Sequence, residues 1–398
     1  MSIYRQLGVE PIINACGAVT RLGGAPMPPE VLEAYHSAAG SAVSLEQLQA
    51  AASSRIAAAT QTQAGLVVSG AAGALTLGTA AVLAGHNLAR MEQLPGCDGF
   101  PNELIIAREQ RSGYDHAVRA AGARFTEIGF NEVVSGAGVR RTEVWEYEAA
   151  ISPQTAGVVY VQTVDSLPPL EEVVAVAHRH NLPVLVDAAG ELPPRSNLQE
   201  IPGTGADLVV FSGGKSIRGP QATGILCGRR DLISAAALQM LDMDDHLTLW
   251  DPPPELIDRS RFDGIPRHGI GRSLKVAKEE IVALLTALDL FVSGAYDAQL
   301  EDYRHWLTAI AGVLSETSIV SRLVEPATSE QWPLLEILVD TATNGKSATE
   351  ICQELRTGTP PVYVGHGRIQ QESLTINPTC LNADLIPVLN QRLIEVLG

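Results

Sequence analysis

A single lysine, Lys215, stands among glycines and small polar residues in the stretch "VVFSGGKSIRGPQATG" (209–224), directly after an apolar run. Glycines permit unusual backbone angles and let other groups approach closely. Two kinds of chemistry suit such an amine. It can grip a phosphate, or, where partial desolvation lowers its proton affinity, it can bond covalently to a carbonyl carbon. A solvated surface charge is the alternative without chemistry.

Two other segments carry similar signals. In "SGAAGALTLG" (69–78) an apolar run leads into a turn of small residues and then a helical pattern. The start of such a helix attracts anions, although tight helix–strand packing explains the same residues. Asp187 ends the apolar run "LPVLVDAAG" (182–190), and ligands of open α/β sheets bind outside such strand ends. Its carboxylate suits a cationic ring nitrogen, a metal ion or a capping bond.

The order of these three signals points to one cofactor. A small-residue turn, a strand-end aspartate and a strand-end lysine together predict a pyridoxal 5'-phosphate (PLP) site. The helix start would hold the phosphate, Asp187 would keep the pyridine nitrogen protonated, and Lys215 would bond to the cofactor aldehyde. No metal is expected.

The elements that position these residues alternate in type. Apolar strand-like runs at 103–108, 156–164 and 206–214 alternate with helical stretches such as 169–181, which predicts an α/β fold with a mostly parallel central sheet flanked by helices. After about residue 275 the pattern changes to a long helix and a smaller α+β unit. We therefore expect an N-terminal segment (1–40) packed with the small domain, a large PLP-binding domain (41–280) and a small C-terminal domain (281–398).

Composition narrows the class of protein. A chain of 398 residues can form one large and one smaller domain. Its net charge of −17 argues against nucleic acid as a partner. No apolar stretch reaches the about 20 residues of a membrane span, and the N-terminus lacks a secretion-signal pattern. The five scattered cysteines form no CxxC pair, which favours a reducing cytoplasm.

Several stretches resemble the fold-type I PLP enzymes, in the branch related to bacterial selenocysteine synthase, and within it the D-glucosaminate and D-glucosaminate-phosphate ammonia-lyases. The resemblance spans most of residues 11–285 and implies the PLP-dependent transferase fold. It is carried by "PIINACGAVTRLGG", "SGAAGALTLGTAAVLAG", "RSGYDHAVRAAGA", "HNLPVLVDAAGELPP", "ADLVVFSGGKSIRGPQATGILCGR" and "GIGRSLKVAKEEIVALL".

The resemblance also implies roles for single residues. Lys215 bonds the cofactor and serves as the base for the substrate Cα proton, and Asp187 pairs with the pyridine nitrogen. The remaining cofactor contacts are Ser69, Gly70, Ala71 and Ser212 at the phosphate, Ala189 under the ring face, and Thr163 and Asp165 near the phenolic oxygen or the substrate.

One segment departs from the family. Where relatives often read Ser-His-Arg-Asn-Gly-Tyr-Asp, this chain has "EQRSGYD" (109–115), so Gln110 stands where an aromatic or histidine ring is expected to stack on the pyridine. Either Gln110 covers the ring, or Tyr114 or His116 does. Candidate groups for a substrate carboxylate or phosphate are Arg21, Arg267, His268, Arg272 and Arg368.

The resemblance implies an α,β-eliminating ammonia-lyase that acts on a hydroxy amino acid or an amino-sugar acid, and it also implies a homo-oligomer, a dimer or a multiple of it. Transamination remains open, as does racemisation or epimerisation, which would need Tyr114 or His116 as a second acid opposite Lys215. Selenium transfer to a charged tRNA is disfavoured by the net charge. The intact Lys215–Asp187 pair disfavours a non-enzymatic regulator.

Overall fold

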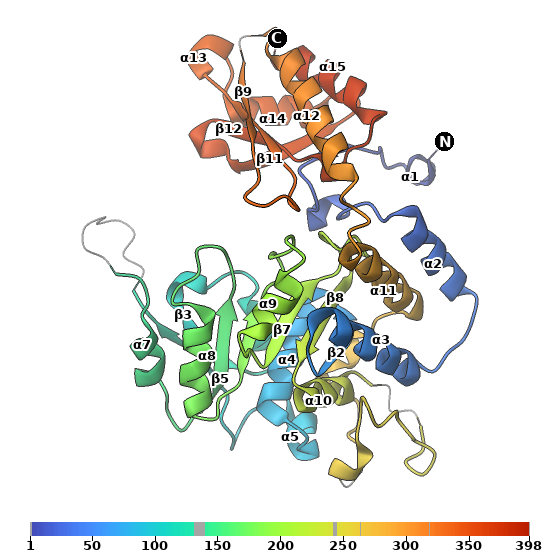
Figure 1. The fold of residues 1–398 in the computed structure, drawn as a ribbon, viewed down its shortest axis with the longest axis vertical. Helices are drawn as coiled ribbons and strands as arrows, with labels where there is room; N and C mark the ends of the chain where they lie inside the picture. Colours follow the sequence, from blue (N-terminus) through green and yellow to red (C-terminus); the bar gives the residue numbers. More distant parts are fainter. Residues whose placement is uncertain (1, 131–139, 242–244, 263, 318, 398) are drawn as a thin grey trace. The chain divides into compact units, whose positions relative to one another are not determined.

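The computed structural model describes residues 2–130, 140–241, 245–262, 264–317 and 319–397. The chain forms two compact units, Met27–Val292 and Met1–Pro26 with Ser293–Gly398 (Figure 1). These limits differ from the boundaries expected from the sequence, because helix α2 (Pro29–Ala39) packs on helix α11 (Lys278–Val292) inside the larger unit. Among the described residues, no helix has the length and apolar character that crossing a bilayer requires.

A seven-stranded sheet forms the centre of the larger unit, in the order β2-β8-β7-β6-β5-β3-β4. The five strands from β7 to β4 are parallel, whereas β8 runs antiparallel to both β7 and β2. The prediction of a mostly parallel sheet is confirmed. The strands are β2 (Ala64–Ser69), β3 (Glu103–Ala107), β4 (Arg124–Ile128), β5 (Thr155–Val161), β6 (Val184–Asp187), β7 (Leu208–Ser212) and β8 (Thr223–Gly228).

Helices cover both faces of this sheet (Figure 1). One group packs around the buried helix α4 (Gly70–Ala84), and the other group contains α3, α8 and α9, which contact β2, β5 and β7. Besides α2, α4 and α11, the helices of this unit have the ranges α3 (Leu45–Thr60), α5 (Leu88–Gln93), α6 (Asp115–Ala120), α7 (Val144–Ala149), α8 (Leu170–Arg179), α9 (Asn197–Gly203) and α10 (Arg230–Met240). Because the central parallel strands are buried between these layers, runs such as Val184–Val186 are apolar throughout.

The smaller unit contains a five-stranded sheet in the order β1-β11-β12-β10-β9. Strand β1 pairs in parallel with β11, with Ile13 opposite Val362, so the first residues of the chain belong to this unit. Its strands are β1 (Ile13–Ala15), β9 (Val320–Val324), β10 (Leu334–Leu338), β11 (Val362–Arg368) and β12 (Ser373–Ile376). Its helices are α1 (Ile3–Gln6), α12 (Gln299–Leu314), α13 (Thr341–Asn344), α14 (Ala348–Thr357) and α15 (Leu385–Leu397).

Candidate active site

Several of the predicted cofactor-binding residues lie where the parallel strands end. Val161 on β5 lies opposite Asp187 on β6, and Asp187 lies opposite Val210 on β7. Lys215 follows the last residue of β7, Ser212, by three positions. The carboxyl ends of three adjacent strands therefore bring together the aspartate and the lysine that the sequence singled out.

Tight backbone packing fixes the loop that carries Lys215. The Gly213 N–H donates to the Thr223 carbonyl (2.9 Å) and the Gly219 N–H to the Gly213 carbonyl (2.9 Å). A Cβ at Gly213 would overlap the Thr223 side chain, and a Cβ at Gly214 would overlap the Gln221 backbone. The glycines around Lys215 are therefore required by a loop that folds back on β8.

Lys215 differs in its surroundings from the three other lysines of the chain. Lys278 donates to the Ala38 and Ala39 carbonyls, Lys346 pairs with Glu354 at 2.7 Å, and Lys275 is exposed after the 3-10 turn η4 (Ile270–Leu274). By contrast, the Nζ of Lys215 lies 3.9 Å from the position that a Cβ at Gly190 would occupy. Lys215 is thus the lysine that stands beside the segment following Asp187.

Asp187 is partly buried and its carboxylate accepts the Ala189 N–H at 3.1 Å. Burial raises the pKa of this carboxyl, while the Ala189 bond and the nearby charge of Lys215 act in the opposite direction. The net shift is upward, so the ionised carboxylate is poorly solvated in this position. A cation placed against it, such as a protonated ring nitrogen, would relieve that cost.

The start of helix α4 offers an anion site beside these residues. Ser69 occupies the N-cap position, but its hydroxyl forms no capping bond to the helix. Gly224 on β8 faces this start, and a Cβ there would lie 2.5 Å from the Gly70 carbonyl carbon and 2.7 Å from the Ala71 nitrogen. Ser212 lies opposite Gly224 across the β7–β8 pair. The predicted phosphate contacts are therefore neighbours around backbone N–H groups at the start of a 15-residue helix.

Gln110 is the buried member of the segment that departs from the family. It closes the 3-10 turn η2 (Arg108–Gln110), is 8% exposed, and its Oε1 accepts the Val161 N–H at 3.0 Å. Among the described residues its Nε2 has no hydrogen-bond partner. Since Val161 lies opposite Asp187, the free amide donor stands next to the predicted ring partner. Buried donors without an acceptor are rare in native proteins, so this amide marks a place where water or a ligand can bind.

The other candidates around the ring are more exposed. Tyr114 is 63% exposed, and His116 lies on the surface with its ring nitrogens 3.2 and 3.4 Å from a guanidinium nitrogen of Arg119. Thr163 and Asp165 are also exposed, and they line a hollow of about 340 Å³ together with Gln110. The geometry therefore groups Gln110, Thr163 and Asp165 at one strand end.

The predicted substrate residues are scattered. Arg267 is 88% exposed and pairs with Glu92 on α5 at 2.6 Å, beyond the end of α4 that lies away from Ser69. Within one chain it is therefore not brought to Lys215. His268 is exposed, and Arg272 lines a hollow of about 490 Å³ between α3 and α10.

Two further substrate candidates belong to the smaller unit. Arg21 places its guanidinium 5.6 Å from the centre of the Tyr363 ring, and Arg368 lies 3.5 Å from Glu336. Each guanidinium therefore already has a neighbour inside its own unit, and a substrate role for either stays a prediction.

Sequence reasoning missed Glu191. This half-buried carboxyl has its pKa raised by burial and by Asp187 and lowered by Lys215, so all three groups share one electrostatic environment. No periodicity marks it, since it follows the strand within a short turn. Its place four residues after a strand-end aspartate is the signal that could have drawn attention to it.

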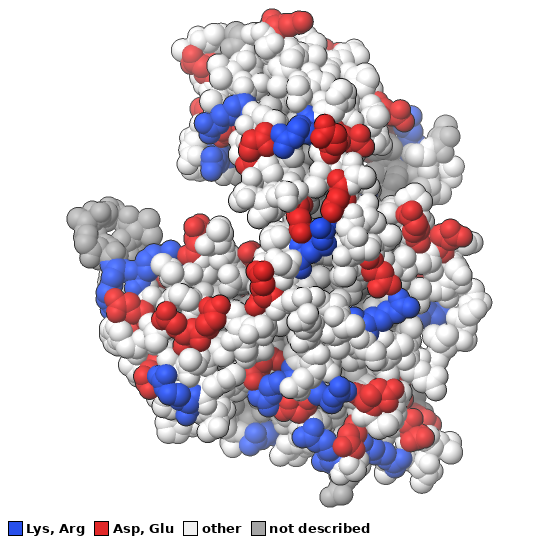
Figure 2. All heavy atoms as spheres, viewed as in Figure 1, with Lys and Arg blue, Asp and Glu red and all other residues white. Residues whose placement is uncertain are grey.

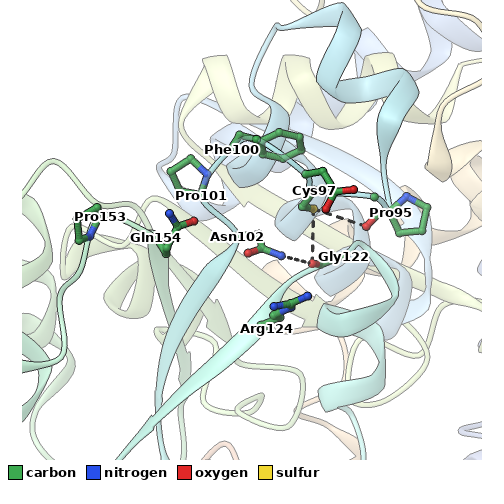
Figure 3. Close-up of a pocket in the computed structure, with 12 residues that line it drawn as sticks. Pro95, Cys97, Phe100, Pro101, Asn102, Gly122, Arg124, Pro153 and Gln154 are labelled. Atoms are coloured by element: carbon green, nitrogen blue, oxygen red, sulfur yellow. Dashed lines mark hydrogen bonds between the residues drawn. The ribbon is translucent and has the colours of Figure 1, made fainter.

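A larger hollow, of about 610 Å³, lies at the amino ends of the parallel strands, opposite the strand ends that carry Asp187 (Figure 3). It is lined by Asn102, Gln154 and Gly122, which precede β3, β5 and β4. The Asn102 amide donates to the Gly122 carbonyl at 2.9 Å. Because parallel strands start there and end beside Asp187, volume alone does not identify the edge where the candidate chemistry lies.

Comparison with known proteins agrees with this geometry. Residues 121–242 match the model of the aminotransferase class-V family. The solved structure of a D-glucosaminate-6-phosphate ammonia-lyase superposes with a TM-score of 0.79 at 25% identity, covering 100% of this chain and 98% of that one. The protein has the fold of the type I PLP enzymes.

Two relatives align with this chain over nearly its whole length. D-glucosaminate-6-phosphate ammonia lyase of Salmonella typhimurium is 26% identical over 99% of this chain and 98% of its own. A 5'-C-glycyluridine monooxygenase-decarboxylase of a Streptomyces species is 29% identical over 99% of this chain and 92% of its own. The expected resemblance to the ammonia-lyases is confirmed, and the second relative carries the name of a different reaction.

Proposed function

We propose that the protein is a PLP-dependent lyase that removes water and then ammonia from a hydroxy amino acid or an amino-sugar acid of the D-glucosaminate type. The observation that carries this proposal is the meeting of Asp187, Lys215 and the start of α4 at one sheet edge. The match to D-glucosaminate-6-phosphate ammonia lyase along the whole chain supports the reaction class.

The residues present suit PLP. The start of α4 at Ser69–Ala71 fits a phosphate because Gly224 has no side chain that would obstruct it. The poorly solvated Asp187 carboxylate fits a cationic ring nitrogen, and the unpartnered Gln110 amide fits an acceptor oxygen of the ring or the substrate. When bound, PLP supplies an electron sink for negative charge at the substrate Cα.

The protein groups then divide the work. Lys215 Nζ would hold the cofactor aldehyde, and as a free amine it would take the Cα proton of the substrate. Asp187 keeps the ring nitrogen cationic by its charge. The backbone N–H groups at the start of α4 and the Ser212 hydroxyl would orient the phosphate, and the partly buried loop 213–222 limits water around the amine.

The test is product analysis with the cofactor-loaded protein. D-Glucosaminate, its 6-phosphate and simple β-hydroxy D-amino acids should release ammonia together with a keto acid. Loss of optical activity without ammonia would show epimerisation instead, and amino transfer to an added keto acid would show transamination. Either result, with no ammonia released from any of these substrates, would overturn the proposal.

A second candidate function rests on the Streptomyces relative, whose name describes an oxygen-dependent decarboxylation of a glycyl nucleoside. An oxygen electrode separates the two reactions. The lyase proposal predicts ammonia release that is unchanged under nitrogen. Oxygen uptake coupled to carbon dioxide release from an α-amino acid would favour the second candidate.

The proposal includes a small-molecule substrate, a homo-oligomer and a cytoplasmic location. On the face shown in Figure 2, acidic and basic side chains of the described residues are interspersed, which is unlike the clustered cations of nucleic-acid-binding surfaces. All five cysteines are free thiols, as expected in a reducing compartment. Light scattering of the purified protein tests the oligomer, and a monomeric mass would refute it.

A further inference from the structure

We propose that Glu191 is the acid that protonates the departing hydroxyl of the substrate. This inference rests on the proposed elimination and adds a catalytic residue to it. Elimination of water needs two proton movements, one from Cα and one to the leaving oxygen. Lys215 accounts for the first, and Glu191 is the carboxyl that the fold places next to it for the second.

The backbone holds Glu191 against the Lys215 loop. The Glu191 N–H closes a turn by donating to the Ala188 carbonyl at 3.1 Å, and the Asn197 side chain donates to the Glu191 carbonyl at 2.6 Å. The next residue is tied across to the lysine loop, because the Ser216 hydroxyl donates to the Leu192 carbonyl at 2.5 Å. Residues 191 and 192 thus run alongside residues 215 and 216.

The amine itself confirms this proximity. A Cβ at Gly190 would lie 3.9 Å from Lys215 Nζ, and the absence of a side chain there leaves space beside the amine. Since Glu191 directly follows Gly190, its carboxyl starts from a backbone position adjacent to that space. Among the hydrogen bonds described for the chain, none engages the carboxyl oxygens of Glu191, so they can meet a substrate group.

The electrostatics suit a proton donor. Partial burial and the charge of Asp187 hold the pKa of Glu191 above its usual range, although Lys215 opposes this shift. A carboxyl that keeps its proton closer to neutral pH can give that proton to a leaving group. Asp187 cannot do so while it is bound to the ring nitrogen.

The proton balance is complete with these two residues. Lys215 Nζ takes the Cα proton, and the Cα–H electron pair forms the Cα–Cβ double bond. The Cβ–O bond breaks with its electron pair on oxygen, and Glu191 gives that oxygen a proton, so water leaves. The proton on Lys215 can return to the Glu191 carboxylate through solvent, which resets both groups.

A comparison of leaving groups tests this role. Hydroxide needs a proton to leave, whereas chloride does not. Glu191→Gln should therefore lower kcat for a β-hydroxy substrate by about 10²- to 10³-fold, in the range of a general acid. The same variant should lower elimination from the β-chloro analogue, for example β-chloro-D-alanine, by less than about threefold. Glu191→Asp should restore part of the activity on the β-hydroxy substrate.

Two controls make the outcomes separable. The visible absorption of the cofactor bonded to Lys215 should persist in Glu191→Gln, which shows that the site is assembled. Glu200→Gln, an exposed carboxyl on α9, should leave both reactions unchanged. An equal loss on both substrates, or none on either, would overturn the role of Glu191 while the lyase function stands. If wild-type protein eliminates neither substrate, the proposed function itself fails.

Discussion

The contact between β8 and the start of helix α4 gives a sharp test of the phosphate site. A Cβ at Gly224 would lie 2.5 Å from the Gly70 carbonyl carbon and 2.7 Å from the Ala71 nitrogen. In Gly224→Ala, β8 and this backbone must move apart by about 0.9 Å to reach an ordinary contact of 3.4 Å. Overpacking of this kind costs about 1–3 kcal/mol.

In the variant, the start of α4 is displaced in the cofactor-free protein. Binding of the phosphate would require it to return to the original geometry, and this return costs the same strain energy. If the full cost falls on binding, 1–3 kcal/mol corresponds to a rise of about 5- to 150-fold in the PLP dissociation constant. The assay is titration of cofactor-free protein with PLP, followed by visible absorption. Circular dichroism must show that the variant is folded.

Gly203→Ala is the matched control. It adds the same methyl group at the end of α9, where a Cβ meets no atom within 4 Å, so the dissociation constant should not change. An unchanged dissociation constant in folded Gly224→Ala would show that the start of α4 does not hold the phosphate, and the assignment of Ser69–Ala71 would be refuted.

Three further outcomes follow from single side chains. Because burial raises the pKa of Asp187, its ionised form destabilises the cofactor-free protein, and the protein gains stability from this group as pH falls through the folded pKa. Asp187→Asn should therefore raise the Tm of the cofactor-free protein at pH 8 and abolish activity. A lower Tm would contradict this. Gln110→Leu leaves the Val161 N–H unpaired and should lower the free energy of unfolding by about 1–3 kcal/mol. Gln110→Glu keeps that acceptor, so it should lower Tm less but weaken PLP binding. Equal PLP affinity in Gln110→Glu and wild type would show that the amide donor meets no ligand. Glu336 is 4% exposed, and its pKa is lowered by the Ser373 hydroxyl and by two arginines. Its ionised form therefore stabilises the fold above the usual pKa of a glutamate, and this effect is lost as pH falls through the lowered pKa. Denaturant titration of Glu336→Gln should show a free energy of unfolding reduced by about 1–3 kcal/mol at pH 7 and by less at pH 3.

The sequence was sufficient for the parts of the fold that depend on local pattern. Buried parallel strands are apolar throughout, so the runs ending at Asp187 and Ser212 could be recognised, and with them the sheet edge that holds Lys215. The reversed direction of β8 does not follow from such a run, since an apolar strand reads the same in either direction. It follows from the short loop 213–222 between β7 and β8, whose length excludes a parallel crossover.

Contacts between distant residues escaped prediction. Arg267 meets Glu92, which is 175 positions earlier in the chain, so its surface ion pair could not be told from a substrate contact. The packing of α2 on α11 is similarly remote and moved both unit boundaries. Glu191 escaped because its proximity to Lys215 depends on the Ser216–Leu192 bond, which joins two loops.

The central claim is a covalent link between Lys215 and PLP, and borohydride reduction followed by peptide mass spectrometry tests it most directly. The chain has four lysines, so the result can be assigned without ambiguity. We predict that the phosphopyridoxyl group is found on the peptide containing Lys215. A reduced adduct on Lys275, Lys278 or Lys346 instead, or no adduct on protein that has bound PLP, would contradict the claim.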